Sequence, residues 1–146
     1  MKFEARDPGY ESRTRENFAS QGFMQTLGVK MTDLEPGRCE LAVAFDDALA
    51  QQHGFFHGGV IATLADVSGG YAAFSLLSPN RTNVTVEFKL SLINPGRGAS
   101  LLAVAEVLKS GRTLTVCRSE VYAVSAEGAR THCATALATY MAIDRD

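Results

Sequence analysis

The chain has 146 residues, of which 46% are hydrophobic and 21% charged, and its formal net charge is −2. This length suits one domain with a sizeable core, so we expect a single domain over residues 1–146 with a loose tail over residues 1–10. The near-neutral charge argues against nucleic acid or a membrane surface as a partner. No apolar stretch resembles a signal peptide or spans a bilayer, so we expect a cytoplasmic protein.

The first half of the chain predicts helices and two strands, followed by one long helix. Apolar residues scattered over 11–27 favour an amphipathic helix or a pair of helices. Segments 29–34 and 39–45 are predicted strands around a Glu-Pro-Gly turn. The helix over residues 58–77 is apolar on nearly all sides and should therefore be buried. Its adjacent glycines at 69–70 each cost about 1 kcal/mol relative to alanine, which the close approach of a strand or second helix would explain.

The second half of the chain predicts strands only. Over residues 82–92 apolar and polar side chains alternate without interruption. The apolar residues that this alternation places on one face are Val84, Val86, Phe88, Leu90 and Leu92. Three more strands, at 100–109, 113–125 and 130–142, are joined by short glycine-containing turns, so neighbours should pair antiparallel. The simplest assembly is an α+β fold with one long central helix wrapped by an antiparallel sheet of five to six strands, plus an N-terminal helical segment.

Residues 53–66 carry the chemistry suggested by the sequence. They join a glycine-rich entry with two histidines to a helix that contains one carboxylate, Asp66. A helix N-terminus presents unpaired backbone N–H groups that can hold an oxyanion. A carboxylate on a buried helix is costly unless something pairs with it or uses it. Oxyanion donors beside a potential base or nucleophile point to acyl chemistry.

The whole pattern resembles the hotdog-fold thioesterases of the phenylacetate-pathway (PaaI-like) branch, over about residues 23–142. The family motif G-x-x-H-G-G-x-x-x-x-L-x-D is complete, and its residues here are Gly54, His57, Gly58, Gly59, Leu64 and Asp66. The resemblance implies a thioester hydrolase that splits a fatty or aryl acyl-CoA into free acid and coenzyme A and needs no cofactor. Aromatic residues near the motif suit either kind of acyl group.

Carried over position by position, the resemblance implies a catalytic role for five residues. Asp66 matches the catalytic carboxylate, acting as general base or nucleophile. The backbone N–H of Gly58 would polarise the thioester carbonyl, and His57 would lie beside that carbonyl. Thr85 matches a Ser/Thr position that orients water or the carboxylate. Gln51 stands where many relatives carry an asparagine that handles substrate or water, so here the amide has one more methylene.

The resemblance also implies residues that bind substrate. Gly59 and Phe56 flank the helix start and are also expected to bind substrate, although an aromatic residue such as Phe56 is more often part of the core than of an acyl pocket. The hairpin at Gly111, Arg112 and Thr113 resembles a family segment that meets the pantetheine or phosphate groups of coenzyme A. Three widely spaced cysteines indicate neither a disulfide framework nor a zinc site, so no metal is expected.

The spacing of the two central groups predicts a shared site. Gly58 and Asp66 are eight residues apart, which corresponds to about 12 Å along one helix. One helix therefore cannot bring its own carboxylate to its own N-terminus. Two copies with antiparallel helices about a two-fold axis would bring each Asp66 near the partner's Gly58. The resemblance implies this homodimer, with a homotetramer built as a dimer of dimers.

Two other functions stay open from the sequence. One is an acyl-thioester dehydratase or hydratase of the same fold, although that branch usually shows a His-Phe-Pro-Gly entry where this chain has His57-Gly58-Gly59. The other is a non-catalytic acyl-CoA-binding protein, against which the intact Asp66 argues weakly.

Overall fold

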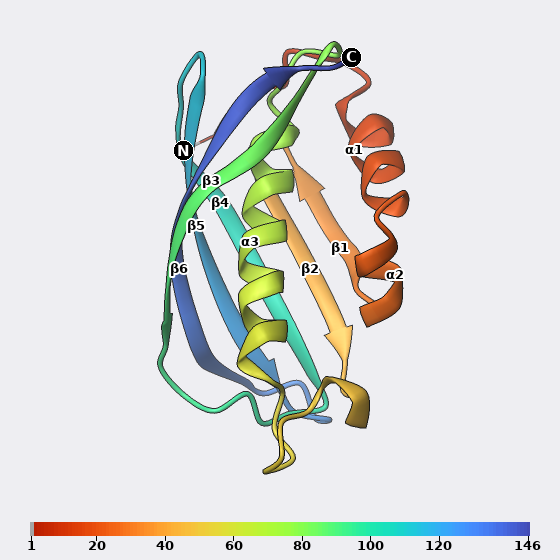
Figure 1. Ribbon diagram of the computed structural model, residues 1–146, viewed down its shortest axis with the longest axis vertical. Helices are drawn as coiled ribbons and strands as arrows, with labels where there is room; N and C mark the ends of the chain where they lie inside the picture. Colours follow the sequence, from red (N-terminus) through yellow and green to blue (C-terminus); the bar gives the residue numbers. More distant parts are fainter. Residues whose placement is uncertain (1) are drawn as a thin grey trace.

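The computed structural model describes residues 2–146 and contains one antiparallel sheet wrapped around a long helix (Figure 1). The strands are β1 Lys30–Glu35, β2 Arg38–Ala44, β3 Arg81–Leu92, β4 Ser100–Ser110, β5 Leu114–Val124 and β6 Arg130–Asp144. Their order in the sheet is β1-β2-β4-β5-β6-β3. The predicted hotdog fold is confirmed, and β4, β5 and β6 pair with their neighbours as expected from the short turns.

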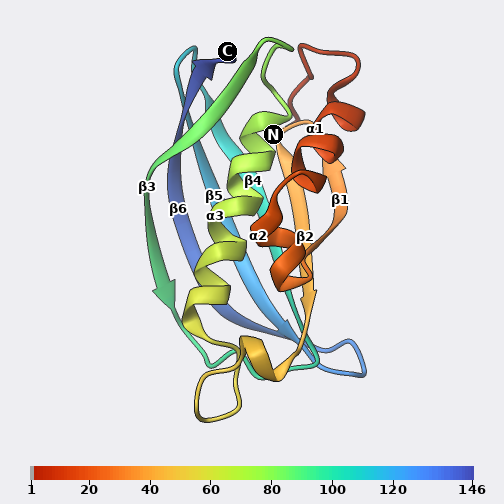
Figure 2. The same cartoon turned by 45° about the vertical axis from the view of Figure 1, so that its right-hand side comes forward.

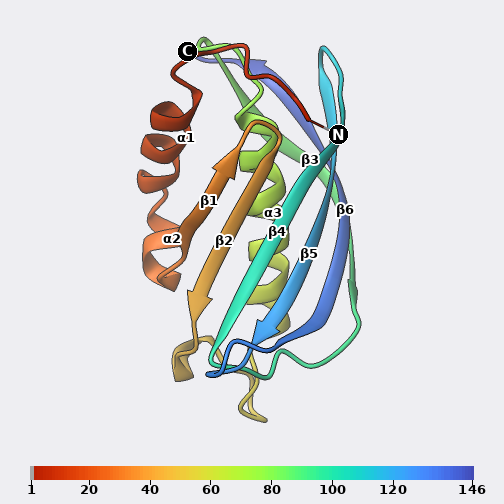
Figure 3. The ribbon, with the colours of Figure 1, turned by 180° about the vertical axis from the view of Figure 1, so that it is seen from behind.

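Three α-helices and one short 3₁₀ helix lie on the concave side of the sheet or at its end. Helix α3, Gly58–Phe74, is the central one, and the pair α1, Tyr10–Ala19, and α2, Gly22–Leu27, stands beside it over β1 (Figure 2). A 3₁₀ helix, η1, covers Asp47–Leu49. From behind, the sheet alone is in front of α3 (Figure 3). Within residues 2–146, no helix is both long and apolar enough to cross a membrane.

The paired glycines of α3 lie against the side chain of Tyr140 on β6. A Cβ added at Gly69 would be 2.3 Å from the hydroxyl oxygen of Tyr140, a distance no real side chain tolerates. The same hydroxyl donates a hydrogen bond to the backbone carbonyl of Asp66, at 2.6 Å. The close approach is made by the side chain of a strand residue, and its hydrogen bond ties the middle of α3 to the sheet.

Strand β3 is an edge strand with an irregularity that the sequence pattern did not reveal. Thr85 pairs with Tyr140 of β6, but the register then shifts before Glu87, which leaves Val86 as an extra residue in a β-bulge. In the part of the strand that follows an extra residue, each side chain lies on the opposite face of the sheet from the one that strict alternation predicts. Thr85 and Phe88 consequently share one face of the sheet, and Val84 lies on the other. The prediction that all five apolar residues of 82–92 share one face is therefore wrong. The bulge is what turns Thr85 toward α3.

The N-terminal segment makes specific contacts. Phe3 packs against the hydrophobic core. Asp7 pairs with Arg13 at 2.8 Å, and the Arg13 guanidinium also donates to the carbonyl of Leu77 at 2.7 Å. The expected loose tail over residues 1–10 is therefore wrong for this segment, because an aromatic ring and an ion pair attach it to the fold. Met1 lies outside the described residues.

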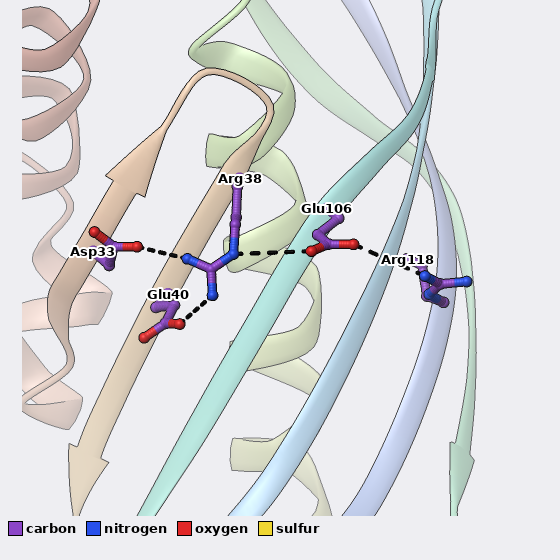
Figure 4. A network of polar contacts seen from close by, with 5 residues as sticks. All are labelled: Asp33, Arg38, Glu40, Glu106 and Arg118. Carbon is purple, nitrogen blue, oxygen red and sulfur yellow. Dashed lines mark hydrogen bonds and ion pairs between the residues drawn. The ribbon is translucent and has the colours of Figure 1, made fainter. Parts of the chain in front are cut away.

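The convex face of the sheet, turned away from α3, carries a network of charged side chains beside exposed apolar ones such as Leu114 and Leu137. Arg38 contacts Asp33 on β1, Glu40 beside it on β2 and Glu106 on β4, and Glu106 lies 3.9 Å from Arg118 on β5 (Figure 4). These charges pair within the face, and exposed pairs of this kind contribute little to stability. The face turned toward α3 holds the hydrophobic core, and Asp66 and Thr85 of the predicted site lie on that side.

Candidate active site

The N-terminus of α3 offers one free backbone donor. His57 is the N-cap residue, and its Nδ1 accepts a hydrogen bond from the Gly59 N–H at 2.8 Å. The Gly58 N–H has no acceptor among residues 2–146. It also lies at the positive end of the helix dipole, which favours a negatively charged ligand. Gly58 is therefore the group best placed to hold an oxyanion, while His57 and Gly59 bond to each other.

Asp66 lies in the middle of α3 on the side that faces β3. Its Oδ1 accepts a hydrogen bond from the Thr85 hydroxyl at 2.8 Å. Partial burial raises the pKa of the Asp66 carboxyl above its ordinary value, and the bond from Thr85 opposes that rise because it stabilises the charged form. A carboxylate whose pKa is raised in this way is a stronger base once ionised.

A cleft of about 330 Å³ opens beside Asp66. Helix α3 forms its floor with Asp66, Val67 and Gly70, and Thr85 of β3 forms one wall. The structure thus brings Asp66 and Thr85 together, as the sequence predicted. The remaining wall comes from the N-terminal helices, to which no site residue was assigned from the sequence.

A second, apolar cleft of about 380 Å³ lies at the helix start and is lined by Gln51, Phe56 and Gly58 among others. The side-chain oxygen Oε1 of Gln51 accepts hydrogen bonds from the backbone N–H groups of His53, at 2.6 Å, and Phe55, at 3.3 Å. That oxygen therefore holds the loop before α3, and only the side-chain NH₂ of Gln51 is left to meet a ligand. His57 and Gly59 line a different groove, between α2 and the start of α3.

The predicted site residues thus form separate groups within one chain. Asp66 and Gly58 belong to different clefts, about 12 Å apart along α3. The hairpin with Gly111, Arg112 and Thr113 lies at the opposite end of the molecule from the start of α3 (Figures 1 and 3). It lines neither cleft, and its Arg112 carbonyl accepts a bond from Arg81 at 3.4 Å.

Several residues beside Asp66 were missed from the sequence. Those with polar side chains are Asn17, Gln21, Tyr71, Thr82, Asn83 and Tyr140. They come from α1, the N-cap position of α2, α3, β3 and β6, so no local spacing connects them. Tyr71 is one of the aromatic residues near the motif, but nothing in the sequence distinguishes it from the others. The glycine pair at 69–70 is the one sequence signal that a strand residue approaches the helix.

Comparison with known proteins gives three matches, and all three are to thioesterases. Residues 53–138, which include Gly58, Asp66 and Thr85, match the family described as the thioesterase superfamily. The crystal structure of a thioesterase family protein from Silicibacter pomeroyi has a TM-score of 0.91 at 45% sequence identity, covering 94% of this chain and 100% of that one. The medium/long-chain acyl-CoA thioesterase YigI of Escherichia coli is 26% identical over 134 residues, 82% of this chain and 84% of its own.

The fold of the PaaI-like branch is found as well. The E. coli PaaI protein from the phenylacetic acid degradation operon has a TM-score of 0.80 at 19% identity, covering 92% of this chain and 93% of that one. The predicted resemblance to hotdog-fold thioesterases is confirmed by these matches.

Proposed function

Because the chain belongs to the thioesterase superfamily and is thus a thioester hydrolase, we propose that it hydrolyses acyl-CoA at sites shared by two subunits. Each site combines Asp66 of one subunit with Gly58 of the partner subunit. The observation that carries this proposal is the free Gly58 N–H at a helix start, together with a carboxylate too far along the same helix to reach it.

Thioester hydrolysis needs two things that these residues supply. The carbonyl oxygen gains negative charge as the tetrahedral intermediate forms, and a preorganised backbone N–H is an effective partner for that charge. The carbonyl carbon needs a nucleophile, which Asp66 supplies by deprotonating a water molecule or by attacking directly. Thr85 holds the carboxylate in place through its 2.8 Å hydrogen bond. In the first route the coenzyme A thiolate leaves and the acid is released. Direct attack instead forms a mixed anhydride with Asp66 as the thiolate leaves, and water then hydrolyses this anhydride to the free acid and Asp66.

The surface of the single chain supports a two-fold partner at β3. Four large apolar side chains on or just after this edge strand are 43–57% exposed: Val84, Val86, Leu92 and Ile93. An exposed apolar edge strand with free backbone groups invites pairing with another chain. Two copies joined at this edge with antiparallel α3 helices would bring each Asp66 cleft to the partner's Gly58 cleft. We propose one domain per subunit and, beyond the dimer, a dimer of dimers.

The test is thiol release from a panel of short, long and aryl acyl-CoAs, with wild type and Asp66→Asn. The asparagine keeps the shape of the side chain but loses its charge and basicity, so we expect kcat to fall at least about 100-fold. Asp47→Asn, at an exposed position of η1, is the matched control and should behave like wild type. Near-wild-type turnover by folded Asp66→Asn would remove this carboxylate from the mechanism. Acyl-CoA binding without any thiol release by wild type would show a binding protein instead.

A further inference from the structure

Four backbone carbonyls of α3 around Asp66 each accept a hydrogen bond from a side chain of the sheet. The carbonyls and their donors are Ala65 with Ser119 Oγ at 2.8 Å, Asp66 with the Tyr140 hydroxyl at 2.6 Å, Gly69 with Cys117 Sγ at 3.4 Å and Gly70 with Asn83 Nδ2 at 2.9 Å. In an α-helix such oxygens already accept the N–H four residues further along, so each sheet donor uses the second lone pair. The sheet therefore fixes the rotation of this part of α3, and with it the direction in which Asp66 points.

Asp66 is held at both ends by two neighbouring residues of the sheet. Thr85 of β3 donates to its Oδ1 at 2.8 Å, and Tyr140 of β6 donates to its backbone carbonyl at 2.6 Å. Thr85 and Tyr140 are direct partners in the register of β3 against β6, at the last pair before the bulge. Side chains of directly opposite residues lie close together on one face of a sheet. One cross-strand pair thus fixes both the backbone and the carboxylate of the same residue.

The Tyr140 hydroxyl has room to reach Asp66 because the helix carries two glycines at this point. Tyr140 is 2% exposed, and a Cβ added at Gly69 would overlap its hydroxyl. Glycine inside a helix is destabilising relative to alanine, so the chain gives up helix stability for this contact.

The contact also acts on the charge of Asp66. Burial, and to a smaller extent the nearby Asp66 charge, raises the pKa of Tyr140 far above its ordinary value, so its hydroxyl stays protonated and remains a donor. Burial also raises the pKa of Asp66, and the hydroxyls of Thr85 and Tyr140 both oppose that rise. Tyr140 therefore favours the ionised carboxylate as well as holding its backbone.

Resting on the proposed thioesterase function, we propose that Tyr140 is a positioning residue, which holds the Asp66 carboxylate where it attacks the thioester or activates water. Small displacements of a catalytic group reduce the rate strongly, because the reacting atoms must be aligned. A group that acts only through Asp66 leaves the binding of acyl-CoA unchanged, so its loss should appear in kcat and not in KM.

The experiment removes one hydroxyl. Tyr140→Phe keeps the ring against the glycine pair, and we expect kcat for thiol release to fall about tenfold with KM unchanged. The fall of kcat/KM on acidification should move to higher pH, because the ionised Asp66 loses a group that stabilises it. Tyr122→Phe is the matched control. Its ring stacks with His132 and does not line the cleft beside Asp66, so kcat and the pH profile should stay those of wild type.

A second variant breaks the same contact from the helix side. Gly69→Ala keeps the tyrosine but its Cβ displaces the hydroxyl, so the pH profile should move in the same direction. The double variant Gly69→Ala/Tyr140→Phe should lose little more kcat than either single variant, since both act through one contact. Gly70→Ala, whose Cβ would make only an ordinary contact, is the control. Gly69→Ala decides the question if Tyr140→Phe does not fold.

Titration of the Asp66 carboxyl by carbon-13 NMR, with the signal assigned by its loss in Asp66→Asn, gives a measurement that does not depend on turnover. We expect a higher Asp66 pKa in Tyr140→Phe than in wild type. Unchanged kcat would overturn the proposal, and so would a lower kcat with an unmoved pH profile and titration, which indicates a structural role alone. If wild type released no thiol at all, the proposed function would fail. The titration would then still decide whether Tyr140 controls this carboxylate, with equal pKa values overturning that control and a higher value in Tyr140→Phe supporting it.

Discussion

Replacing Gly58 by proline removes the proposed oxyanion donor and changes little else. Gly58 is the first residue of α3, where proline is accepted because that N–H has no partner within a helix. His57 has φ −61° and ψ 139°, the extended backbone that residues before proline adopt. A Cβ at Gly58 would lie 3.4 Å from Leu92 Cδ1, an ordinary contact. We expect kcat for thiol release to fall about 100- to 1,000-fold, the usual loss for one oxyanion donor.

The matched control is Gly58→Ala, which adds the same Cβ but keeps the N–H. It should retain far more activity than Gly58→Pro in the same assay. Thermal unfolding and gel filtration must first show that both variants fold and associate like wild type. Equal activities of the two folded variants would mean that the Gly58 N–H takes no part in the reaction.

Mixing Gly58→Pro with Asp66→Asn subunits tests the shared site directly. Either homodimer lacks one component in every site. In a mixed dimer, one site carries both changes and the other carries neither. Random exchange of equal amounts makes half of the dimers mixed, so activity should recover to about a quarter of wild type in a closed two-fold dimer. If differently tagged subunits demonstrably exchange and no activity returns, each subunit must build its own site and the geometric reasoning is wrong.

Three further outcomes are expected. Because burial raises the pKa of Asp66, kcat/KM should fall on acidification at a pH above the ordinary aspartate range. Thr85→Val removes the hydrogen bond that stabilises the ionised Asp66 carboxylate, so the fall of kcat/KM on acidification should move to still higher pH. An unchanged pH–rate profile would speak against the Thr85–Asp66 contact. Arg112→Ala should raise KM with little change in kcat, and the effect should shrink at high salt, if this residue meets a coenzyme A phosphate; a loss of kcat alone would misplace the coenzyme. Gly69→Ala should lower the free energy of unfolding by about 1–3 kcal/mol through overpacking, because its Cβ would lie 2.3 Å from the Tyr140 hydroxyl. Gly70→Ala is the control, because the nearest atom to its Cβ would be 3.4 Å away. Equal urea denaturation of Gly69→Ala and Gly70→Ala would contradict this.

The sequence alone determined the features that depend on local pattern and chain length. Alternation and turn residues predicted each strand, and the apolar run after residue 58 predicted α3, although the helix ends at Phe74 rather than at residue 77. The motif predicted Asp66 and Gly58 as site residues, and helix geometry alone predicted that they act together only across two chains. Such features are readable because periodicity and caps act between residues a few positions apart.

Only the tertiary structure decided how distant segments meet. The bulge at Val86, which turns Thr85 toward Asp66, depends on the register of β3 against β6, and nothing within β3 itself marks it. The cleft beside Asp66 joins Asn17 and Gln21 to Tyr71, which lies 54 and 50 residues further along the chain, respectively. Contacts of this kind arise from packing of whole elements, whose free energy is shared among many side chains, so no short stretch of sequence carries their signature.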